Sequence, residues 1–271
     1  MKKFTNIILL SDMDGTLLNT QGFVSKENQE AVNYFVKNGG LFGIATGRNH
    51  LNSVLFLDEI KVNAPSILIN GCGVYDFDKK KFIRLYELSK TKLIAFLKQC
   101  LREFPDITIQ IYCPELCYFV SQESQADPYL VETHQPCEFC QIDDISELPW
   151  IKILFCGESQ ALKALNEQMI REGLENELRW VFSSEVYLEF LPYGISKGSA
   201  LLHIKEIMGS GYKIYAVGDY NNDIEMLQAA DVGIATQNAI ISLKEVADRI
   251  TVNNDENAIA DIIYNIIEAG V

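Results

Sequence analysis

The sequence predicts an α/β protein with a mainly parallel sheet. Short apolar runs alternate with segments of helical period from one end of the chain to the other, and polar residues gather just after several of the apolar runs. A central stretch has a different pattern, which predicts an insertion. With 271 residues, of which 48% are hydrophobic, the chain is long enough to bury a large core.

The alternation begins at the start of the chain. Residues 7–10 form a predicted buried strand, and residues 25–38 form a predicted helix that ends at a pair of glycines. Residues 41–45 and 66–69 are the next predicted strands. The predicted helix carries its apolar residues on one side, at Ala31, Val32, Phe35 and Val36.

The last third repeats this rhythm. Ser196 can cap a helix that runs to about residue 208, and residues 213–217 and 222–230 follow as a strand and a short helix. A closing helix is predicted from apolar residues at helical spacing, namely Ile259, Ile262, Ile263, Ile266 and Ile267. Residues 1–85 and 186–271 therefore form one predicted core domain.

Between these parts, residues 86–185 predict an α+β insertion. Apolar residues at helical spacing from 93 to 104 precede alternating segments near 107–112 and 118–122, and a second cycle of strand, helix and strand follows between 151 and 183. The insertion is expected to be a domain of its own.

Composition argues against several function classes. The 23 Lys and Arg against 37 Asp and Glu give a formal net charge of −14, which repels a nucleic-acid backbone. No apolar run approaches the about 18 residues of a membrane span, and no export signal is visible. Seven Cys suit reduced thiols better than a disulfide framework. We expect a cytoplasmic monomer without a nucleic-acid or membrane partner.

The strongest local pattern is Asp12-Met13-Asp14-Gly15-Thr16, directly after the first predicted strand. Two carboxylates at this spacing can converge on one divalent cation while one of them stays available as a nucleophile. Open α/β sheets bind ligands at the carboxyl ends of their strands, where this motif falls. The alternative is a solvated acidic loop in which Asp14 and Gly15 form a turn.

Two further segments also follow predicted strands. In Thr46-Gly47-Arg48 the threonine hydroxyl and backbone N–H groups can hold phosphate oxygens, although Thr-Gly is also an ordinary strand exit. The segment from Gly218 to Asp223 offers Asp219 and Asp223 beside helix N-terminal N–H groups, and its alternative is a helix cap rich in Asp and Asn.

Lys197 lies in the first turn of the helix that Ser196 caps. The helix dipole disfavours a cation there, and that cost makes sense if the ammonium group faces an anion or a carboxylate cluster. A lone lysine at such a position is more often a solvated surface residue.

Taken together and in this order, the four segments resemble the haloacid dehalogenase superfamily, and within it the Cof-type phosphatase group. The resemblance spans nearly the whole chain. It implies a Rossmann-like three-layer core interrupted by an α+β cap domain that serves substrate specificity, and residues 86–185 fall in the place of that cap.

The resemblance also implies residue roles at the acidic motifs. Asp12 would be the nucleophile that becomes an aspartyl phosphate, and Asp14 would be the acid and base. Mg²⁺ would bind an Asp12 oxygen, the Asp14 backbone carbonyl and Asp219, while Asp223 would orient the water shell of the metal.

The other motif residues would serve the phosphoryl group. Thr46, with Gly47, and Asn222 would hold phosphoryl oxygens, and Lys197 would offset charge on Asp12 and on the transferring group. Arg48 would brace the cap or touch the substrate.

The expected function is a Mg²⁺-dependent phosphatase of small phosphorylated metabolites, such as sugar phosphates or phosphorylated cofactors. A phosphotransferase or phosphomutase on the same fold is the first alternative, and a non-catalytic phospho-acceptor switch is the second. The substrate itself is not predicted, and the candidates for pocket-lining cap residues are Tyr112, Tyr118, Trp180 and Tyr187.

Cysteines in the insertion offer a competing metal site. Cys137-x-x-Cys140 has metal-ligand spacing, and Cys113 with Cys117 can complete a tetrahedral zinc site; His134 lies in the same stretch. Against this, no second Cys-x-x-Cys occurs, so buried or surface thiols are the favoured interpretation.

Overall fold

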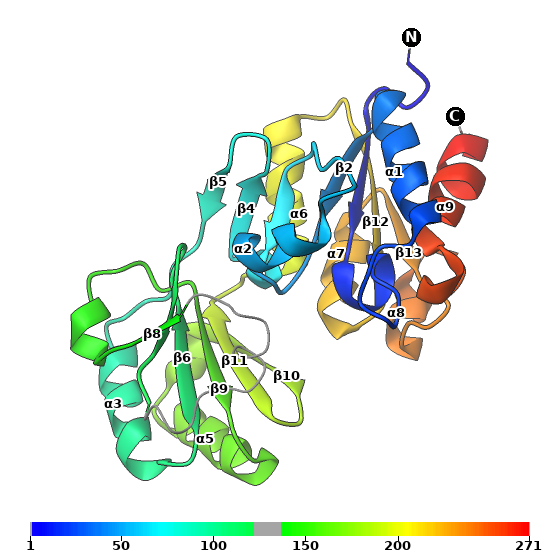
Figure 1. Cartoon of the computed structure of the whole chain (residues 1–271). Helices are drawn as coiled ribbons and strands as arrows, with labels where there is room; N and C mark the ends of the chain where they lie inside the picture. The colour runs from blue at the N-terminus through cyan, green and yellow to red at the C-terminus, as the bar shows by residue number, and fades with distance from the viewer. Residues whose placement is uncertain (1, 122–136, 271) are drawn as a thin grey trace. The chain divides into compact units, whose positions relative to one another are not determined.

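The computed structural model describes residues 2–121 and 137–270, and the chain divides into two compact units (Figure 1). Unit 1 comprises Met1–Leu85 and Ser196–Val271, and unit 2 comprises Tyr86–Ile195. Among the described residues, no helix has the length and apolar character needed to cross a bilayer.

Unit 1 is built on a five-stranded parallel sheet. Its strands stand in the order β14-β13-β12-β1-β2, so the first strand of the chain lies between strands from both ends of the sequence. The strands are β1 (Ile7–Ser11), β2 (Leu41–Ile44), β12 (Lys213–Gly218), β13 (Val232–Ala235) and β14 (Arg249–Ile250). The described strand β1 is buried along its whole length, as an internal parallel strand requires.

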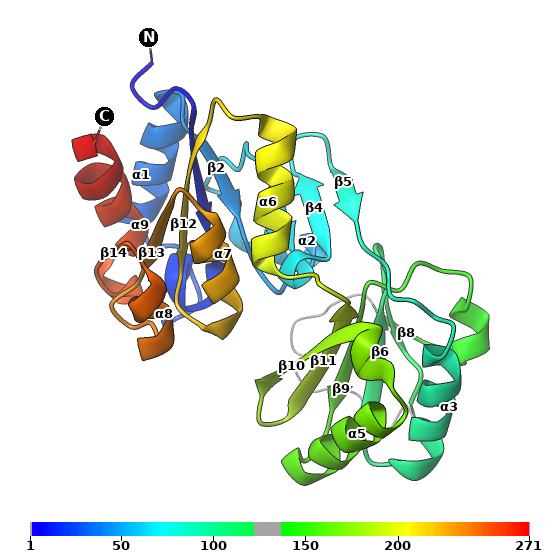
Figure 2. The same cartoon turned by 180° about the vertical axis from the view of Figure 1, so that it is seen from behind.

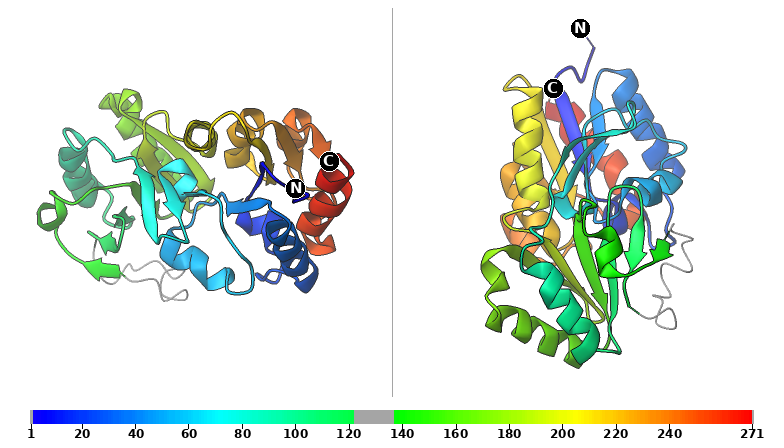
Figure 3. Two further views of the ribbon diagram at one scale, coloured as in Figure 1. Left: turned by 90° about the horizontal axis from the view of Figure 1, so that it is seen from above. Right: turned by 90° about the vertical axis from the view of Figure 1, so that its left-hand side faces the viewer.

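Helices cover both faces of this sheet and complete three layers (Figure 3). On one face α1 (Lys26–Lys37) packs against α9 (Ala258–Asp261) and the helical turns that follow it. The other face carries α6 (Lys197–Met208) and α7 (Ile224–Ala229), whose apolar side chains form a core with alternate residues of β1 and β12 such as Leu10 and Ala216. Two short helices, α2 (His50–Ser53) and α8 (Ile241–Val246), complete the unit.

A small antiparallel sheet adjoins the end of β2. It consists of β3 (Ser66–Leu68), β4 (Gly73–Asp76) and β5 (Lys81–Leu85), and a single parallel bridge between Ala45 and Ile67 joins it to the main sheet. The turn between β3 and β4 has three successive residues with positive φ, namely Ile69, Asn70 and Gly71.

Unit 2 is a six-stranded mixed sheet with helices on one face (Figure 2). The strand order is β10-β11-β9-β6-β7-β8, and β7 and β8 are its only parallel pair among the described residues. Its elements are α3 (Leu93–Glu103), β6 (Thr108–Tyr112), β7 (Cys117–Phe119), β8 (Cys137–Phe139), β9 (Lys152–Cys156), α5 (Ser159–Arg171), β10 (Leu178–Ser184) and β11 (Tyr187–Pro192). A separate core joins the helices to alternate strand residues such as Ile153 and Phe155.

The α/β class and the Rossmann-like parallel sheet agree with the prediction, but one domain boundary was wrong. Residues 186–195 were expected in the core domain, whereas they belong to unit 2. Strand β11 pairs with β10 on one side and with β9 on the other, for example Leu188 with Phe182 and Phe155. This pairing commits the segment to the inserted sheet.

Candidate active site

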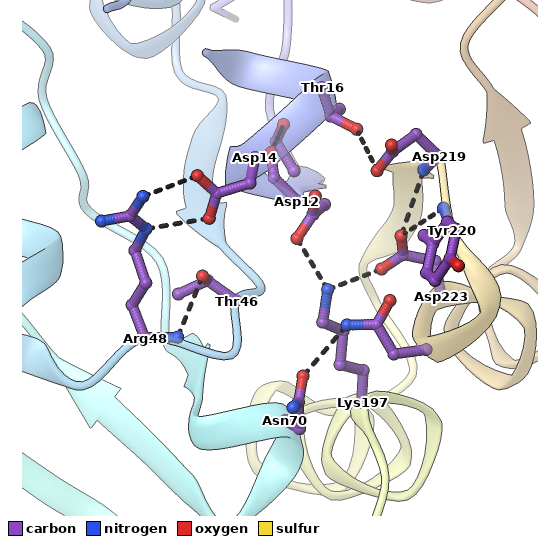
Figure 4. Close-up of polar contacts among 12 residues, drawn as sticks. Asp12, Asp14, Thr16, Thr46, Arg48, Asn70, Lys197, Asp219, Tyr220 and Asp223 are labelled. Carbon is purple, nitrogen blue, oxygen red and sulfur yellow. Dashed lines mark hydrogen bonds and ion pairs between the residues drawn. The ribbon is translucent and has the colours of Figure 1, made fainter. Parts of the chain in front are cut away.

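The loops that follow β1, β2 and β12 meet at one edge of the main sheet, together with the start of α6 (Figure 4). Backbone hydrogen bonds fix this arrangement, because Asp12 N donates to Val217 O at 2.9 Å and Ala45 N donates to Ser11 O at 2.7 Å. Parallel pairing places equivalent strand ends side by side. The predicted site residues Asp12, Thr46 and Asp219 therefore lie just beyond the ends of neighbouring strands.

Lys197 is the centre of the buried part of the site. Its side chain is 0% exposed, and its Nζ donates to Asp12 Oδ1 and to Asp223 Oδ1, each at 2.7 Å. Burial alone lowers the pKa of this ammonium group, but the charges of Asp12 and Asp223 outweigh burial and raise it. The lysine therefore faces a carboxylate cluster and not solvent.

Three carboxylates gather around this lysine. One oxygen each from Asp12, Asp219 and Asp223 lies within 4.8 Å of the others. Burial raises the pKa of Asp12, against the opposing effect of Lys197. Burial and the neighbouring Asp223 raise the pKa of Asp219 to about 6.

Backbone N–H groups and a hydroxyl group also bind the carboxylates of this cluster. Asp223 Oδ2 accepts from the backbone N–H groups of Asp219 and Tyr220 at 3.1 and 3.2 Å, and Thr16 Oγ1 donates to Asp219 Oδ1 at 3.4 Å. Gly15 has a φ of 78°, and a Cβ there would lie 2.4 Å from Asp219 Oδ2. Only glycine lets the first loop approach the Asp219 carboxylate this closely.

The cluster fits a hard divalent cation. Three buried or half-buried carboxylates share one ammonium group, so the cluster carries a surplus of negative charge, which adds to burial in raising the pKa of Asp12 and of Asp219. Oxygen ligands of this kind are those that Mg²⁺ prefers.

Asp14 lies apart from this cluster. Its side chain is 57% exposed and turns toward Arg48, whose Nε and Nη2 donate to Asp14 Oδ2 and Oδ1 at 2.8 and 2.6 Å. Figure 4 shows the Asp14 and Asp12 carboxylates pointing to different cations. Arg48, expected to brace the cap or touch the substrate, is thus paired with the predicted acid and base.

Thr46 and Asn222 line the same site from two other loops. Thr46 is buried, and its hydroxyl oxygen accepts from Arg48 N at 3.2 Å. Asn222 Nδ2 donates to Asn70 Oδ1 at 3.0 Å, and Asn70 N donates to Thr46 O at 3.0 Å. A Cβ on Gly47 would lie 3.2 Å from the Asn70 amide, so the glycine permits this close packing.

Comparison with known proteins decides the family. A family model for haloacid dehalogenase-like hydrolases matches residues 9–263. The chain belongs to this family. It is 30% identical to a 5-amino-6-(5-phospho-D-ribitylamino)uracil phosphatase, YwtE, of Bacillus subtilis over 94% of this chain and 96% of the relative. A haloacid dehalogenase-like hydrolase of Bacteroides thetaiotaomicron has the same fold, with 25% identity, a TM-score of 0.83 and coverage of 97% and 99%.

Another relative is much longer. The chain is 28% identical to an Arabidopsis thaliana protein named as a chloroplastic endoribonuclease, YBEY, but spans only 46% of its length. Together these matches confirm the predicted superfamily and its Cof-type group, the fold class, and the expected enzyme class, a phosphatase of the haloacid dehalogenase superfamily.

In this haloacid dehalogenase-like hydrolase, Asn70 is a site residue to which the sequence analysis assigned no role. Its side chain bonds to Asn222 and packs against Gly47. The available indication was the Asn70-Gly71 pair directly after a predicted strand, a dipeptide that favours turns with positive φ.

The cysteines of unit 2 do not form a metal site among residues 2–121 and 137–270. There, the only set of three or more His, Cys, Asp or Glu with suitable geometry is Asp12, Asp219 and Asp223. Burial raises the pKa of Cys113 to about 12, and Cys117 lies beside Cys137 in the pairing of β7 with β8. His134 lies outside the described residues.

Proposed function

We propose that this protein is a Mg²⁺-dependent phosphatase of small phosphorylated metabolites that works through an aspartyl phosphate on Asp12. One observation carries the proposal: Asp12 is buried at a strand end, paired with the buried Lys197 and within reach of two further carboxylates. A phosphoryl dianion can approach a carboxylate only where cations and aimed donors cancel their repulsion.

The first step transfers the phosphoryl group to the enzyme. One Asp12 oxygen attacks phosphorus, a P–O bond to Asp12 forms, and the ester P–O bond breaks with its electron pair left on the ester oxygen. The protonated carboxyl of Asp14 gives its proton to that oxygen, so the leaving group departs as an alcohol.

The second step restores the enzyme. Water attacks the phosphorus of the aspartyl phosphate, the Asp14 carboxylate takes a proton from that water, and the bond between phosphorus and Asp12 breaks. The products are inorganic phosphate and the free Asp12 carboxylate, and Asp14 is again protonated for the next substrate.

The remaining residues hold the phosphoryl group. Lys197 offsets negative charge on Asp12, while the Thr46 hydroxyl, the backbone around Gly47 and the Asn222 amide supply donors to phosphoryl oxygens. Mg²⁺, when bound by Asp12, Asp219 and the Asp14 backbone carbonyl with Asp223 behind them, supplies positive charge to the same oxygens.

The substrate class rests on the relatives and on the inserted unit. The Bacillus relative is named for a phosphorylated ribityl compound, which supports a phosphate monoester of a sugar-like or cofactor-like molecule. We assign recognition of the leaving group to unit 2, which has its own core and contributes none of the site residues described above.

A phosphate-release screen tests the proposal. Purified protein with Mg²⁺ is expected to release phosphate from members of a panel of phosphorylated metabolites that includes p-nitrophenyl phosphate. The Asp12→Asn variant is expected to release phosphate at least about 1,000-fold more slowly, because the nucleophile is lost. Asp78→Asn, an exposed carboxylate of unit 1, is the control and should retain full activity. Unchanged turnover in Asp12→Asn, or a folded wild type that hydrolyses nothing, contradicts the proposal, and transfer of phosphate to an added sugar in place of water would indicate a phosphotransferase.

A further inference from the structure

The pair of Arg48 and Asp14 joins two loops of the site. Asp14 lies in the loop after β1 and Arg48 in the loop after β2, and their two hydrogen bonds run in parallel, from Nε to Oδ2 at 2.8 Å and from Nη2 to Oδ1 at 2.6 Å. Parallel bonds between a guanidinium group and a carboxylate fix the orientation of both planes, which a single bond does not.

Arg48 is held in place by groups other than Asp14. Its Nη1 donates to Asn52 Oδ1 at 2.7 Å, and its guanidinium carbon lies 4.5 Å from the ring centroid of Phe56. Its backbone N–H is bound by the Thr46 hydroxyl oxygen. Asn52 is itself buried at the start of α2, where Asn49 accepts from its backbone N–H at 2.8 Å. The guanidinium group is therefore a fixed support for whatever it binds.

The two partners differ in exposure. The Arg48 side chain is 16% exposed, whereas that of Asp14 is 57% exposed. A half-exposed ion pair adds little to stability. The carboxylate is accessible to a small molecule while the cation that orients it is largely enclosed, which suits a role in catalysis better than a role in folding.

The site thus gives its two neighbouring carboxylates separate counter-ions. Lys197 is shared by Asp12 and Asp223, whereas Asp14 is paired with Arg48. Two carboxylates with different environments take different roles in acid–base chemistry.

We infer that Arg48 is a positioning residue for Asp14. Its paired hydrogen bonds hold the Asp14 carboxyl group apart from the buried cluster at Asp12 and in one orientation, from which Asp14 gives its proton to the ester oxygen as the ester P–O bond breaks and the bond from Asp12 to phosphorus forms. This inference rests on the proposed function, because it assigns Arg48 to the proton transfer in the first step.

The test compares two leaving groups. An alkyl phosphate needs a proton on its departing oxygen, whereas the nitrophenolate of p-nitrophenyl phosphate departs without one, so only the alkyl substrate depends on Asp14. For Arg48→Ala, kcat/KM on the best alkyl phosphate is expected to fall about 100-fold, and on p-nitrophenyl phosphate about fivefold or less. Asp14→Asn should shift the ratio of the two values in the same direction, and the double variant should add almost nothing further.

Two more variants separate positioning from other roles. Arg48→Lys keeps the charge but loses the paired geometry, and it should recover only part of the alkyl rate. Asn52→Ala loosens Arg48 without touching Asp14, and it should lower the alkyl rate in the same direction by about three- to tenfold. Arg249→Ala, at an exposed arginine of unit 1, is the matched control and should move neither rate.

The outcomes are distinct. Suppose that Arg48→Ala lowers kcat/KM equally on the two substrates while Asp14→Asn changes the ratio of the two kcat/KM values. Arg48 then binds the phosphoryl group, and the inference is overturned. If Arg48→Ala no longer unfolds cooperatively, the Asn52→Ala variant provides the test. An unchanged ratio of kcat/KM on the alkyl phosphate to kcat/KM on p-nitrophenyl phosphate in that variant also overturns the inference. A folded wild type that hydrolyses neither substrate contradicts the proposed function itself.

Discussion

A single lysine offsets part of the negative charge of the buried site. Lys197 is wholly enclosed and shared by Asp12 and Asp223. Removing one partner of a buried ion pair leaves the other charge without compensation, which is far more costly than losing a surface pair. The same residue therefore supports both the fold and the proposed chemistry.

We predict that Lys197→Met unfolds more easily by about 3–5 kcal/mol in the absence of Mg²⁺. Added Mg²⁺ should raise the thermal midpoint of the variant more than that of the wild type, because the cation compensates carboxylates that have lost their ammonium partner. Activity should remain low, since the charge next to the phosphoryl group is missing. Thermal unfolding with and without Mg²⁺ measures this.

Lys205→Met is the matched control, because this lysine lies on the same helix and pairs with Asp231 at the same distance of 2.7 Å but at a half-exposed position. It should cost no more than about 1 kcal/mol and leave the Mg²⁺ response unchanged. An equal Mg²⁺ response in wild type and Lys197→Met would argue that the cation does not bind beside Lys197.

At the scale of elements, the turn between β3 and β4 sets the position of α6. Gly71 has a φ of 103°, and a Cβ there would lie 2.1 Å from Ser196 O and 3.1 Å from Lys197 N. Ser196 caps α6, with its Oγ accepting from Ser199 N at 3.1 Å. The glycine thus allows the turn to pack directly against the start of the helix that carries Lys197.

We predict that Gly71→Ala lowers both stability and activity. Positive φ alone costs about 1–2 kcal/mol for a residue with a Cβ, and the backbone contact at Ser196 adds to this because neither backbone can yield cheaply. The displaced start of α6 should also move Lys197 and lower kcat by more than the loss of folded protein explains. Urea unfolding and steady-state kinetics on the same preparations measure the two effects.

Gly22→Ala isolates the steric part of this prediction. Gly22 has a φ of 81°, and a Cβ there would meet nothing within 4 Å. This control should lose only the conformational cost of positive φ and keep its kcat. If the two variants behave alike, the contact between Gly71 and Ser196 has no influence on the site.

Several elements of unit 1 were predictable from sequence, namely β1, β2, β3, β12, α1, α6 and α7, whereas β4, β5, β13 and β14 were not predicted. The predicted strands already place the candidate site at one edge of a parallel sheet. Apolar runs give the strands, and parallel pairing brings the loops after β1, β2 and β12 to one edge. The side-chain partners were not predictable in this way. The contact between Arg48 and Asp14 depends on the side-chain conformation of Arg48, and the contact between Asn70 and Asn222 depends on a turn with positive φ. A hydrophobic pattern predicts neither of these features.

The domain boundary failed for a related reason. The run Tyr187–Pro192 is a strand by its composition, but the sheet to which a strand belongs depends on pairing between distant segments. Sequence alone gave no indication that β11 would lie between β10 and β9. Long-range pairing, and not local propensity, therefore decides where unit 2 ends.

At the scale of the whole molecule, the candidate catalytic residues and the inserted unit come from different segments of the chain. All the residues assigned to the chemistry belong to unit 1, although its two segments are 110 residues apart in sequence. The chain leaves unit 1 after Leu85 and returns at Ser196, and both residues lie at the small antiparallel sheet and its turn. Leu85 pairs with Gly73 on β4, and Gly71 packs on Ser196. A short linker can therefore join Leu85 to Ser196 without disturbing the main sheet.

We predict that a variant in which a short Gly-Ser linker replaces residues 86–195 folds cooperatively and keeps its response to Mg²⁺. Unit 1 retains buried apolar residues on both faces of the sheet, such as Leu10 on one face and Leu9 on the other, and the carboxylates Asp12, Asp219 and Asp223. A ligand that binds only the folded state raises the thermal midpoint, so Mg²⁺ with orthovanadate should stabilise both the variant and the full chain. Turnover of the best metabolite should fall much further than turnover of p-nitrophenyl phosphate, because unit 2 is assigned to recognition of the leaving group. Equal losses on both substrates, in a variant that still responds to Mg²⁺, would move that recognition from unit 2 to the loops of unit 1.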